Sequence, residues 1–209
     1  METAKISKKL LKRLPGYLAH LKSLPENSNV SATSMAKALG LGDVQVRKDL
    51  AKVSDAGRSR TGRGREQLMR DIERYLDFAA KTGTVVIGAG KLGRALLDYS
   101  GFEESGLNVM AGFDLDPCAD QTESGKPIYP MSRLESFCRH YDVYIGIIAV
   151  PAESAQSVCD TLVDCGITAI WNFAPVHLKV PDRVIVQSEN LAVSLATLRV
   201  QMKKQNPTC

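Results

Sequence analysis

The sequence has 209 residues, of which 44% are apolar and 24% charged, so its composition is that of a globular protein and excludes an intrinsically disordered chain. The longest apolar run, Ile145 to Ala152, is far shorter than the about 20 residues of a membrane-spanning helix, and no apolar segment follows the N-terminal lysines as in a secretory signal. The five cysteines form no CxxC motif. We therefore expect a cytoplasmic protein with reduced thiols, no metal site and no membrane partner.

The charge is distributed unevenly along the chain. Residues 1–83 carry 17 Lys and Arg against 9 Asp and Glu, whereas residues 84–209 carry 10 against 14. A basic half of this kind predicts contact with a polyanion, and nucleic acid is the leading candidate. A basic surface without any partner would have the same composition.

The first residues are predicted to form a helix. Ser7 is a candidate N-cap, and Pro15 is expected to kink the helix or to restart it. The apolar residues of this segment recur at helical spacing, namely Leu10, Leu14, Tyr17, Leu21 and Leu24.

A helix-turn-helix pattern follows. A short helix, capped by Ser31 or Thr33, is expected to end at Gly40, and Asp43 is placed to cap the next helix, from Val44 to Val53. That helix has an apolar stripe on one side and polar or basic residues on the other. This arrangement is typical of a helix that reads DNA.

The segment 54–65 contains three glycines and four arginines but no apolar residue larger than alanine. Because it cannot pack a core, we predict that it is the wing of a winged-helix domain, with arginines suited to a narrow minor groove. A flexible basic linker is the alternative. The candidate DNA-binding residues are Gln45, Arg47, Lys48, Lys52, Arg58, Arg60, Arg63 and Arg65.

A further helix over 66–80 is expected to complete a first domain of residues 1–83. From Thr84 onward the chain alternates short apolar strands with helices, which predicts an α/β domain. The strands are expected at 84–87, 108–113, 143–150, 169–172 and 183–187. The helices are expected to begin near Lys91, Ser132, Ala152 and Ser188.

The stretch Gly88-Ala-Gly-Lys-Leu-Gly93 is a G-x-G-x-x-G motif between a predicted buried strand and a helix. In that setting the glycines allow a tight turn, a close approach to a pyrophosphate and helix–strand packing. Asp114 ends the next predicted strand, about 20 positions on, where a carboxylate binds a ribose diol and repels a 2′-phosphate. We therefore expect the cofactor to be NADH or NAD⁺ rather than NADP(H). Coenzyme A, which related domains bind, is the alternative ligand, and Asp114 argues against it.

The carboxyl ends of the later strands are expected to border the same site, since ligands bind there in doubly wound sheets. Ordinary packing at strand ends is the alternative for these residues. The candidate cofactor-binding residues are Gly88, Ala89, Gly90, Lys91, Leu92, Gly93, Asp114, Asp116, Val150, Pro151, Phe173, Ala174 and Pro175.

The sequence offers little for catalysis. A dehydrogenase needs a substrate domain and a proton-transfer group near the nicotinamide. All residues after Gly88 are needed for the cofactor-binding fold, so none remain for a substrate domain. His20 lies in the first predicted helix, His140 is expected at the outer end of another, and His177 has no acidic neighbour. We expect a sensor rather than an enzyme. The alternative is a small NAD-dependent oxidoreductase with a basic N-terminal oligomerisation domain.

Seven stretches of the sequence recur in the same order in one known family. They are Arg13-Leu-Pro-Gly-Tyr-Leu18, Gln45-Val-Arg-Lys-Asp-Leu-Ala51, Gly88-Ala-Gly-Lys-Leu-Gly-Arg-Ala-Leu96, Tyr99-Ser-Gly-Phe102, Phe113-Asp-Leu-Asp-Pro117, Ala149-Val-Pro-Ala152 and Asn172-Phe-Ala-Pro-Val176. On these residues the chain closely resembles the Rex family of bacterial redox-sensing repressors.

The resemblance implies a homodimer with three parts in each chain. These are a winged helix-turn-helix DNA-binding domain (1–83), a Rossmann NAD(H)-binding domain with a doubly wound parallel sheet (84–187), and a dimer-swapped C-terminal helix with a tail (188–209), the helix itself spanning 188–199. It also implies a repressor that binds inverted-repeat operator DNA when NAD⁺ is abundant and leaves it on binding NADH.

Three features depart from the family's pattern. The segment 54–65 is richer in arginine than the family's wing and lacks its aromatic residues, so we expect a different operator preference. Asn190 stands where the family usually carries Asp, and Ala19 stands where it carries Arg. Because that Asp and Arg are linked to switching, we expect altered coupling between cofactor and DNA. Tyr99 and Asn190 are the residues that the resemblance implies for switching and dimer contact.

Overall fold

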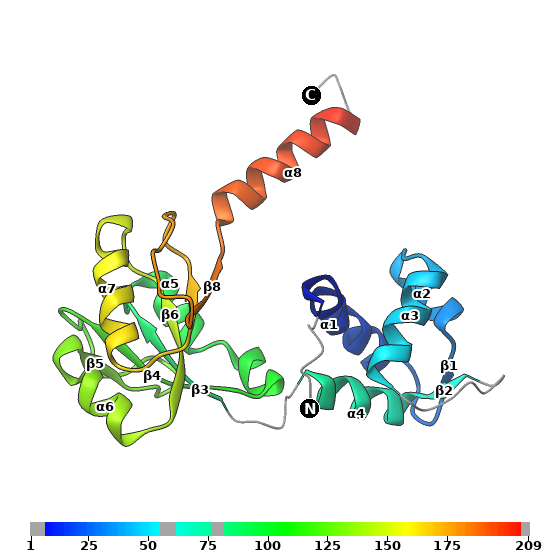
Figure 1. Ribbon diagram of the computed structural model, residues 1–209, viewed down its shortest axis with the longest axis horizontal. Helices are drawn as coiled ribbons and strands as arrows, with labels where there is room; N and C mark the ends of the chain where they lie inside the picture. The colour runs from blue at the N-terminus through cyan, green and yellow to red at the C-terminus, as the bar shows by residue number, and fades with distance from the viewer. Residues whose placement is uncertain (1–6, 55–61, 77–81, 206–209) are drawn as a thin grey trace. The chain divides into compact units, whose positions relative to one another are not determined.

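The computed structural model describes residues 7–54, 62–76 and 82–205. The chain divides into two compact units, residues 1–79 and 80–209. Figure 1 shows the helices of the first unit and the sheet of the second.

The described part of the first unit contains four helices and a two-stranded sheet. In chain order these are α1 (Lys8–Lys22), β1 (Asn29–Val30), α2 (Ala32–Leu39), α3 (Asp43–Val53), β2 (Arg63–Gly64) and α4 (Arg65–Tyr75). β1 and β2 pair antiparallel, with Val30 opposite Arg63. The helices share one core, to which α1 contributes Leu14 and Tyr17 and α3 contributes Val46 and Leu50. This arrangement confirms the predicted winged helix-turn-helix fold.

Local signals fixed most helix ends of this unit. The Ser31 hydroxyl accepts a hydrogen bond from the Ser34 amide at 3.0 Å and so caps α2, and Gly40 ends that helix in the left-handed conformation, at φ 63°. α1 continues through Pro15, so the helix does not restart there, and buried residues on both sides of the proline belong to the same core. One prediction was wrong. Asp43 is the first residue of α3 rather than its cap, a position that Gly42 holds.

The second unit contains a six-stranded parallel sheet. Its strands are β3 (Thr82–Ile87), β4 (Leu107–Asp114), β5 (Ile128–Pro130), β6 (Val143–Ile148), β7 (Ala169–Asn172) and β8 (Ile185–Ser188). They lie in the order β5-β4-β3-β6-β7-β8, and every neighbouring pair is parallel. This is the strand order of the Rossmann fold. Successive strands are added toward one edge of the sheet from β3 to β5 and toward the other edge from β6 to β8.

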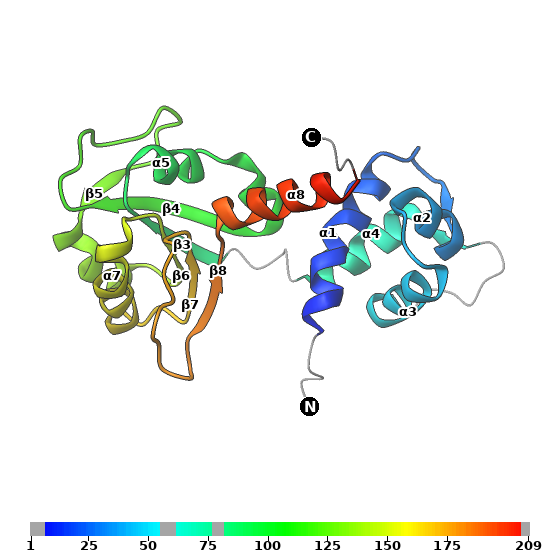
Figure 2. The ribbon, with the colours of Figure 1, turned by 90° about the horizontal axis from the view of Figure 1, so that it is seen from above.

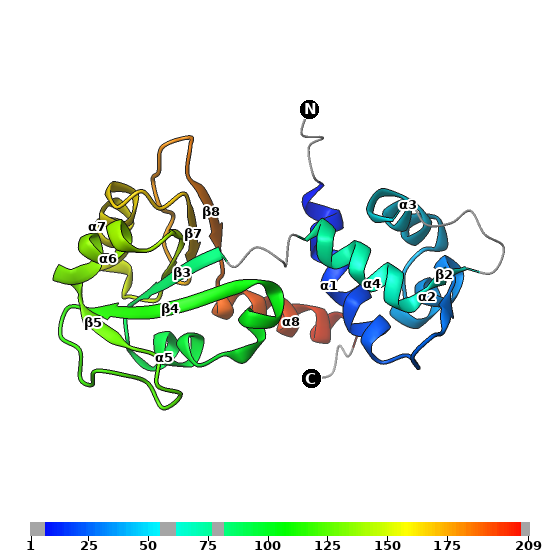
Figure 3. The same cartoon turned by 90° about the horizontal axis from the view of Figure 1, so that it is seen from below.

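Helices cover both faces of this sheet. They are α5 (Lys91–Leu97), the 3₁₀ helices η1 (Ser100–Ser105) and η2 (Met131–Arg133), α6 (Leu134–His140) and α7 (Ala152–Asp164). The last helix, α8 (Leu191–Gln205), does not cover the sheet, and its side chains are exposed. Figures 2 and 3 show α5 on one face and α7 on the other. Accordingly, Leu97 of α5 and Leu162 of α7 lie in separate buried clusters. The expected doubly wound fold is therefore confirmed.

The strand and helix boundaries differ from the predictions at a few places. β6 ends two residues earlier than expected, at Ile148, and β8 begins at Ile185 rather than at 183. β5 was not predicted at all. α8 begins at Leu191 rather than near Ser188, and Asn190 caps it, since its side-chain oxygen accepts a hydrogen bond from the Val193 amide at 3.0 Å.

Asn172, at the end of β7, fixes the loop that follows. It is fully buried, its amide donates to the carbonyls of Ala174 and Val176 at 3.1 and 2.9 Å, and its side-chain oxygen accepts from the Ala174 amide at 2.9 Å. The side chain thereby satisfies the Val176 carbonyl and the Ala174 amide in the interior, and it gives the Ala174 carbonyl a second donor beside the Val176 amide, which lies at 2.8 Å.

We predict that Asn172→Ala lowers the free energy of unfolding of this unit by about 2 kcal/mol or more, because it leaves buried backbone groups without partners. Trp171 is the single tryptophan of the sequence, so its fluorescence during denaturant unfolding measures the change. Asn108→Ala, at a half-buried position of β4, is the control and should cost less. Equal losses in the two variants would contradict the assignment.

Candidate cofactor cleft and nucleic-acid interface

The turn after β3 depends on three glycines. Gly88 adopts a positive φ of 97°, and a Cβ added there would lie 2.6 Å from the Ala149 carbonyl oxygen. A Cβ on Gly93 would lie 1.7 Å from the Gly88 carbonyl oxygen, so α5 packs against the strand only because this position has no side chain. Gly90, the N-cap of α5, faces open space. The tight turn and the helix–strand packing are as the motif predicted, and the space at Gly90 is where it predicts a pyrophosphate.

A cleft of about 600 Å³ opens at this turn. It lies at the carboxyl ends of β3, β4 and β6, where the strand order reverses, and its surface is mostly apolar. Its lining residues are Ile87, Gly88, Gly90, Asp114, Leu115, Met131, Ser132, Ala149, Val150, Pro151, Ser154, Ser157, Val158 and Thr161. Its position and size are those of a nucleotide site in a doubly wound sheet.

Asp114 is held rigidly at the end of β4. Its Oδ2 accepts a hydrogen bond from the Ala89 amide at 2.6 Å, and its Oδ1 accepts one from the Asp116 amide at 3.2 Å. A carboxylate has about four acceptor positions, so those left over can still receive the hydroxyls of a ribose. The hydrogen bond from the Ala89 amide also attaches the end of β4 to the glycine turn. Asp114, the expected partner of the ribose, therefore lies next to the turn that is expected to bind the pyrophosphate.

The structure brings only some of the predicted cofactor residues to the cleft. Five of them line it, namely Gly88, Gly90, Asp114, Val150 and Pro151. Five more are near these in the sequence but do not line the cleft, namely Ala89, Lys91, Leu92, Gly93 and Asp116. Phe173, Ala174 and Pro175, expected to form a second apolar border, do not line it either. Phe173 stacks on Trp171, with 4.5 Å between ring centroids, and Ala174 is buried in the core.

Sequence reasoning missed two parts of the cleft wall. One is the pair Met131 and Ser132 at the start of η2, and the other is the hydroxyl row of Ser154, Ser157 and Thr161 on α7. The helical spacing of those three hydroxyls, directly after Pro151, was a usable signal.

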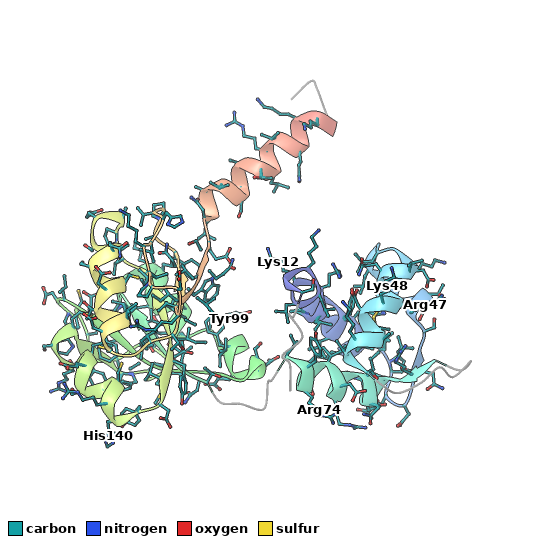
Figure 4. All side chains as sticks on the ribbon, in the orientation of Figure 1. Lys12, Arg47, Lys48, Arg74, Tyr99 and His140 are labelled. Atoms are coloured by element: carbon teal, nitrogen blue, oxygen red, sulfur yellow. The ribbon has the colours of Figure 1, made fainter. Side chains whose placement is uncertain are left out.

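Asp114 is the only titratable side chain among the residues that line the cleft. Its carboxylate already accepts two backbone hydrogen bonds. His140 lies at the end of α6 and points away from the sheet (Figure 4). The described cleft thus offers no histidine, lysine, cysteine or tyrosine to exchange a proton with a substrate.

In the first unit, the outer face of α3 is polar and basic. Gln45, Arg47, Lys48 and Lys52 are all exposed, as predicted, and Figure 4 shows Arg47 and Lys48 extending from the helix. Val44 is also exposed and was not predicted. Val44 lies one turn from Arg47 and Lys48, so an apolar side chain is exposed next to them.

Beneath this face, a buried carboxylate attaches α3 to α1. Asp49 is 3% exposed, and its two oxygens accept hydrogen bonds from the Arg13 guanidinium at 2.7 and 2.9 Å. The Tyr17 hydroxyl donates to it at 2.8 Å, and so does the Gln45 side-chain amide. The three hydrogen bonds from α1 therefore fix the rotation of α3 about its axis, and the fourth, within α3, holds the side chain of the base-reading candidate Gln45.

The same contacts shift two pKa values. Burial acts to raise the pKa of Asp49, but the hydrogen bonds from Arg13, Tyr17 and Gln45 outweigh it, so this pKa lies below its ordinary value. Burial, reinforced by the hydrogen bond to Asp49, raises the pKa of Tyr17 to about 12.

The predicted wing arginines have different surroundings. Arg58 and Arg60 lie outside the described residues. Arg63 is half-buried in β2. Arg65 is not on the wing surface: its side chain is 13% exposed, its Nε donates to the Leu21 carbonyl at 2.8 Å, and an Nη donates to Glu66 at 2.9 Å. This corrects the prediction, because Arg65 fastens the start of α4 to the end of α1.

The C-terminal helix and the segment after α5 expose apolar surface. Every side chain of α8 from Leu191 to Lys204 is exposed, including leucines, valines and a methionine. Tyr99 is 59% exposed, and its ring packs edge-on against Phe102, which in turn contacts Trp171. A helix with apolar residues all round is ordinarily covered by another element.

In the described ranges 7–54, 62–76 and 82–205, no cluster of three or more His, Cys, Asp or Glu side chains is arranged to hold a metal ion. Within the same residues, no helix has the length and apolar character needed to cross a bilayer.

Comparison with known proteins identifies the family of the chain. The chain is 37% identical over 201 residues to the redox-sensing transcriptional repressor Rex of Bacteroides thetaiotaomicron, covering 95% of this chain and 91% of that protein. It is 39% identical to the Rex repressor of Treponema denticola, covering 92% and 93%. The chain belongs to the Rex family.

Solved structures of one Rex-family repressor, RSP, match the whole chain. RSP in complex with NAD⁺ and operator DNA matches with a TM-score of 0.89 at 32% identity, covering 97% of this chain and 95% of that chain. RSP in complex with NADH matches with a TM-score of 0.83. Models of two broader families also match, a putative DNA-binding protein N-terminus over residues 5–51 and a CoA binding domain over residues 79–176.

For this Rex-family chain we predict that Tyr17→Phe lowers the free energy of unfolding of the first unit by about 1.5 kcal/mol near neutral pH, because Asp49 loses a charge-assisted hydrogen bond. The raised pKa of Tyr17 stabilises the fold below its ordinary pKa of 10, and this contribution is lost as the pH rises through about 12. The difference between wild type and variant should therefore shrink from about pH 10 to about pH 12.

Far-ultraviolet circular dichroism during denaturant unfolding measures this difference. Tyr75→Phe, on α4, is the matched control. A difference between wild type and Tyr17→Phe that stays constant over the alkaline range would show that Tyr17 does not titrate with folding.

Proposed function

We propose that this chain is a transcriptional repressor that senses the balance of NADH and NAD⁺, binds inverted-repeat operator DNA as a homodimer and is released on binding NADH. One observation carries the proposal: a single chain combines the glycine-turn cleft with an exposed basic recognition helix. Its relative RSP, matched over nearly the whole chain, has been solved with NAD⁺ and operator DNA and with NADH. As a transcription regulator, the protein would act in the cytoplasm.

The domain roles follow from the same arrangement. Residues 1–83 would bind DNA, residues 84–187 would bind the cofactor, and residues 188–209 would form the dimer. In the first domain, Gln45, Arg47, Lys48, Lys52 and Arg63 are the proposed DNA contacts.

The glycine turn and Asp114 support a pyridine dinucleotide. The open space at Gly90 leaves room for a pyrophosphate against the start of α5, and the fixed carboxylate of Asp114 favours a ribose diol over a 2′-phosphate. The match to a CoA binding domain supports the same fold but a different ligand. The position of Asp114 favours NAD(H), because the 3′-phosphate on the ribose of coenzyme A would meet a carboxylate.

The preference for NADH over NAD⁺ would come from charge. The oxidised nicotinamide is a cation and the reduced ring is neutral, so burial against apolar groups such as Val150 and Pro151 is less costly for NADH. A ligand moves an equilibrium only through its different affinities for the two states, and near-complete switching requires a difference of about 10⁴-fold. The reduced cofactor would thereby select a dimer whose recognition helices no longer match successive major grooves.

The exposed α8 supports the homodimer. Its outward residues Leu191, Leu195, Leu198 and Met202 form one stripe, with spacings of four, three and four positions, and Val193 and Val200 extend the apolar surface. An exchange of α8 between two subunits would cover this surface. Tyr99 and Asn190 remain the proposed switch and dimer residues, Asn190 through its cap on α8.

The function is tested by titrating the purified protein with NADH and with NAD⁺, and with coenzyme A as a third ligand, by fluorescence. A gel shift on the chain's own promoter region follows, with and without each ligand. We expect NADH to bind more tightly than NAD⁺ and to release the DNA. Equal affinities, or DNA binding that NADH leaves unchanged, would contradict the sensor, and release by coenzyme A alone would identify a different effector.

Asp114→Asn should weaken NADH binding by about tenfold and reduce the preference for NADH over NADPH, because it removes the charge that repels a 2′-phosphate and one of the ribose acceptors. DNA binding without cofactor should be unaffected. Asp120→Asn, an exposed carboxylate beyond the cleft, is the control. An unchanged NADH-to-NADPH ratio in Asp114→Asn would remove Asp114 from the site.

A further inference from the structure

Asp43 occupies an unusual place on a helix that is proposed to bind DNA. It is the first residue of α3, and each of its carboxylate oxygens has one partner. Oδ1 accepts a hydrogen bond from the Thr33 hydroxyl at 2.7 Å, and Oδ2 accepts one from the Arg47 guanidinium at 2.7 Å. Because Thr33 belongs to α2, this carboxylate connects both helices of the helix-turn-helix to the arginine on the recognition face.

This contact restricts Arg47 before any DNA arrives. The Arg47 side chain is 67% exposed, so without a partner it would populate many rotamers and lose that freedom on binding. Asp43 engages one Nη of the guanidinium. A guanidinium has five N–H donors in a rigid fork, so the remaining donors can still reach a pair of acceptors on a base.

The negative charge of Asp43 has a second effect. A carboxylate at the start of a recognition helix is repelled by the phosphates of any duplex, whatever the sequence. Arg47 compensates for this repulsion where it meets the paired acceptors of guanine. Asp43 thus weakens binding to most DNA more than it weakens binding to a matching site.

We propose that Asp43 is a specificity-determining residue, which is anchored by Thr33, positions Arg47 for base readout and lowers the affinity for non-operator DNA. The proposal rests on the proposed DNA-binding function. An acidic residue in the first turn also stabilises its own helix, and the experiment has to separate that role from readout.

The test compares wild type and Asp43→Asn, as full-length cofactor-free proteins, in selection from a duplex library with randomised bases. We expect Asp43→Asn to select the wild-type motif except for one base pair in each half-site, which becomes degenerate. In equilibrium binding, the ratio of affinities for the selected and the scrambled duplex should fall about tenfold, within the range of one bidentate base contact. Binding to the scrambled duplex should tighten.

Three further variants show whether Asp43 acts through Arg47. In an Arg47→Ala background, Asp43→Asn should change the affinity ratio no further. Thr33→Val leaves the carboxylate in place without its anchor, and should relax the same base pair to a smaller extent; it also provides the test if Asp43→Asn does not fold. Glu123→Gln, an exposed residue of the second unit, makes the same change in formal charge and should behave as wild type.

An unchanged motif and affinity ratio in Asp43→Asn, with a selective wild type, would overturn this inference alone. Uniform weakening at every base pair would overturn it too, since that result indicates loss of helix stability rather than of readout. If the wild type itself selected no motif, the proposed function and this inference would both be wrong.

Discussion

The close approach of Gly93 to the Gly88 carbonyl is the constraint on which the cofactor unit depends. This approach sets α5 against β3, and the approach of Gly88 to Ala149 brings the ends of β3 and β6 together. The cleft opens between these strands, and the bond from Ala89 to Asp114 attaches β4 to the same turn. The proposed cofactor residues are thus positioned by a backbone path that a side chain at either glycine would block.

In the DNA-binding unit, buried and half-buried carboxylates have the corresponding role. Asp49 fixes α3 from below through Arg13 and Tyr17, and it also holds Gln45. Asp43 holds Arg47 from the start of the helix. The two polar side chains proposed to contact bases are therefore already oriented in the free protein, which would reduce the entropy lost on binding.

Features set by neighbouring residues could be predicted from the sequence. The Gly40 stop, the strand from Ala169 to Asn172 and the glycine turn all depend on local geometry, and the alternation of strands and helices was sufficient for the α/β class. The Rossmann fold itself was implied by the family resemblance. The strand β5 was missed because it has three residues and ends in a proline, too few to show a periodic pattern.

Features that depend on distant contacts could not be predicted. Arg65 was assigned to the wing, but its carbonyl partner, on Leu21, is 44 positions away in the sequence. The spacing of Ser154, Ser157 and Thr161 places them on one face of α7, but the packing of that helix on the sheet decides that this face borders the cleft. For the same reason, the stretch from Phe173 to Pro175 follows a strand as expected, but does not reach the cleft wall.

The bare surface of α8 has a consequence for the cell. In a single protomer the apolar side chains of α8 are exposed to solvent. If α8 forms the dimer, the free energy of unfolding depends on the concentration of the protein. Scarce chains would remain single and open to proteases, whereas abundant chains would protect one another. The amount of repressor would then change more steeply than its rate of synthesis, independently of the redox signal.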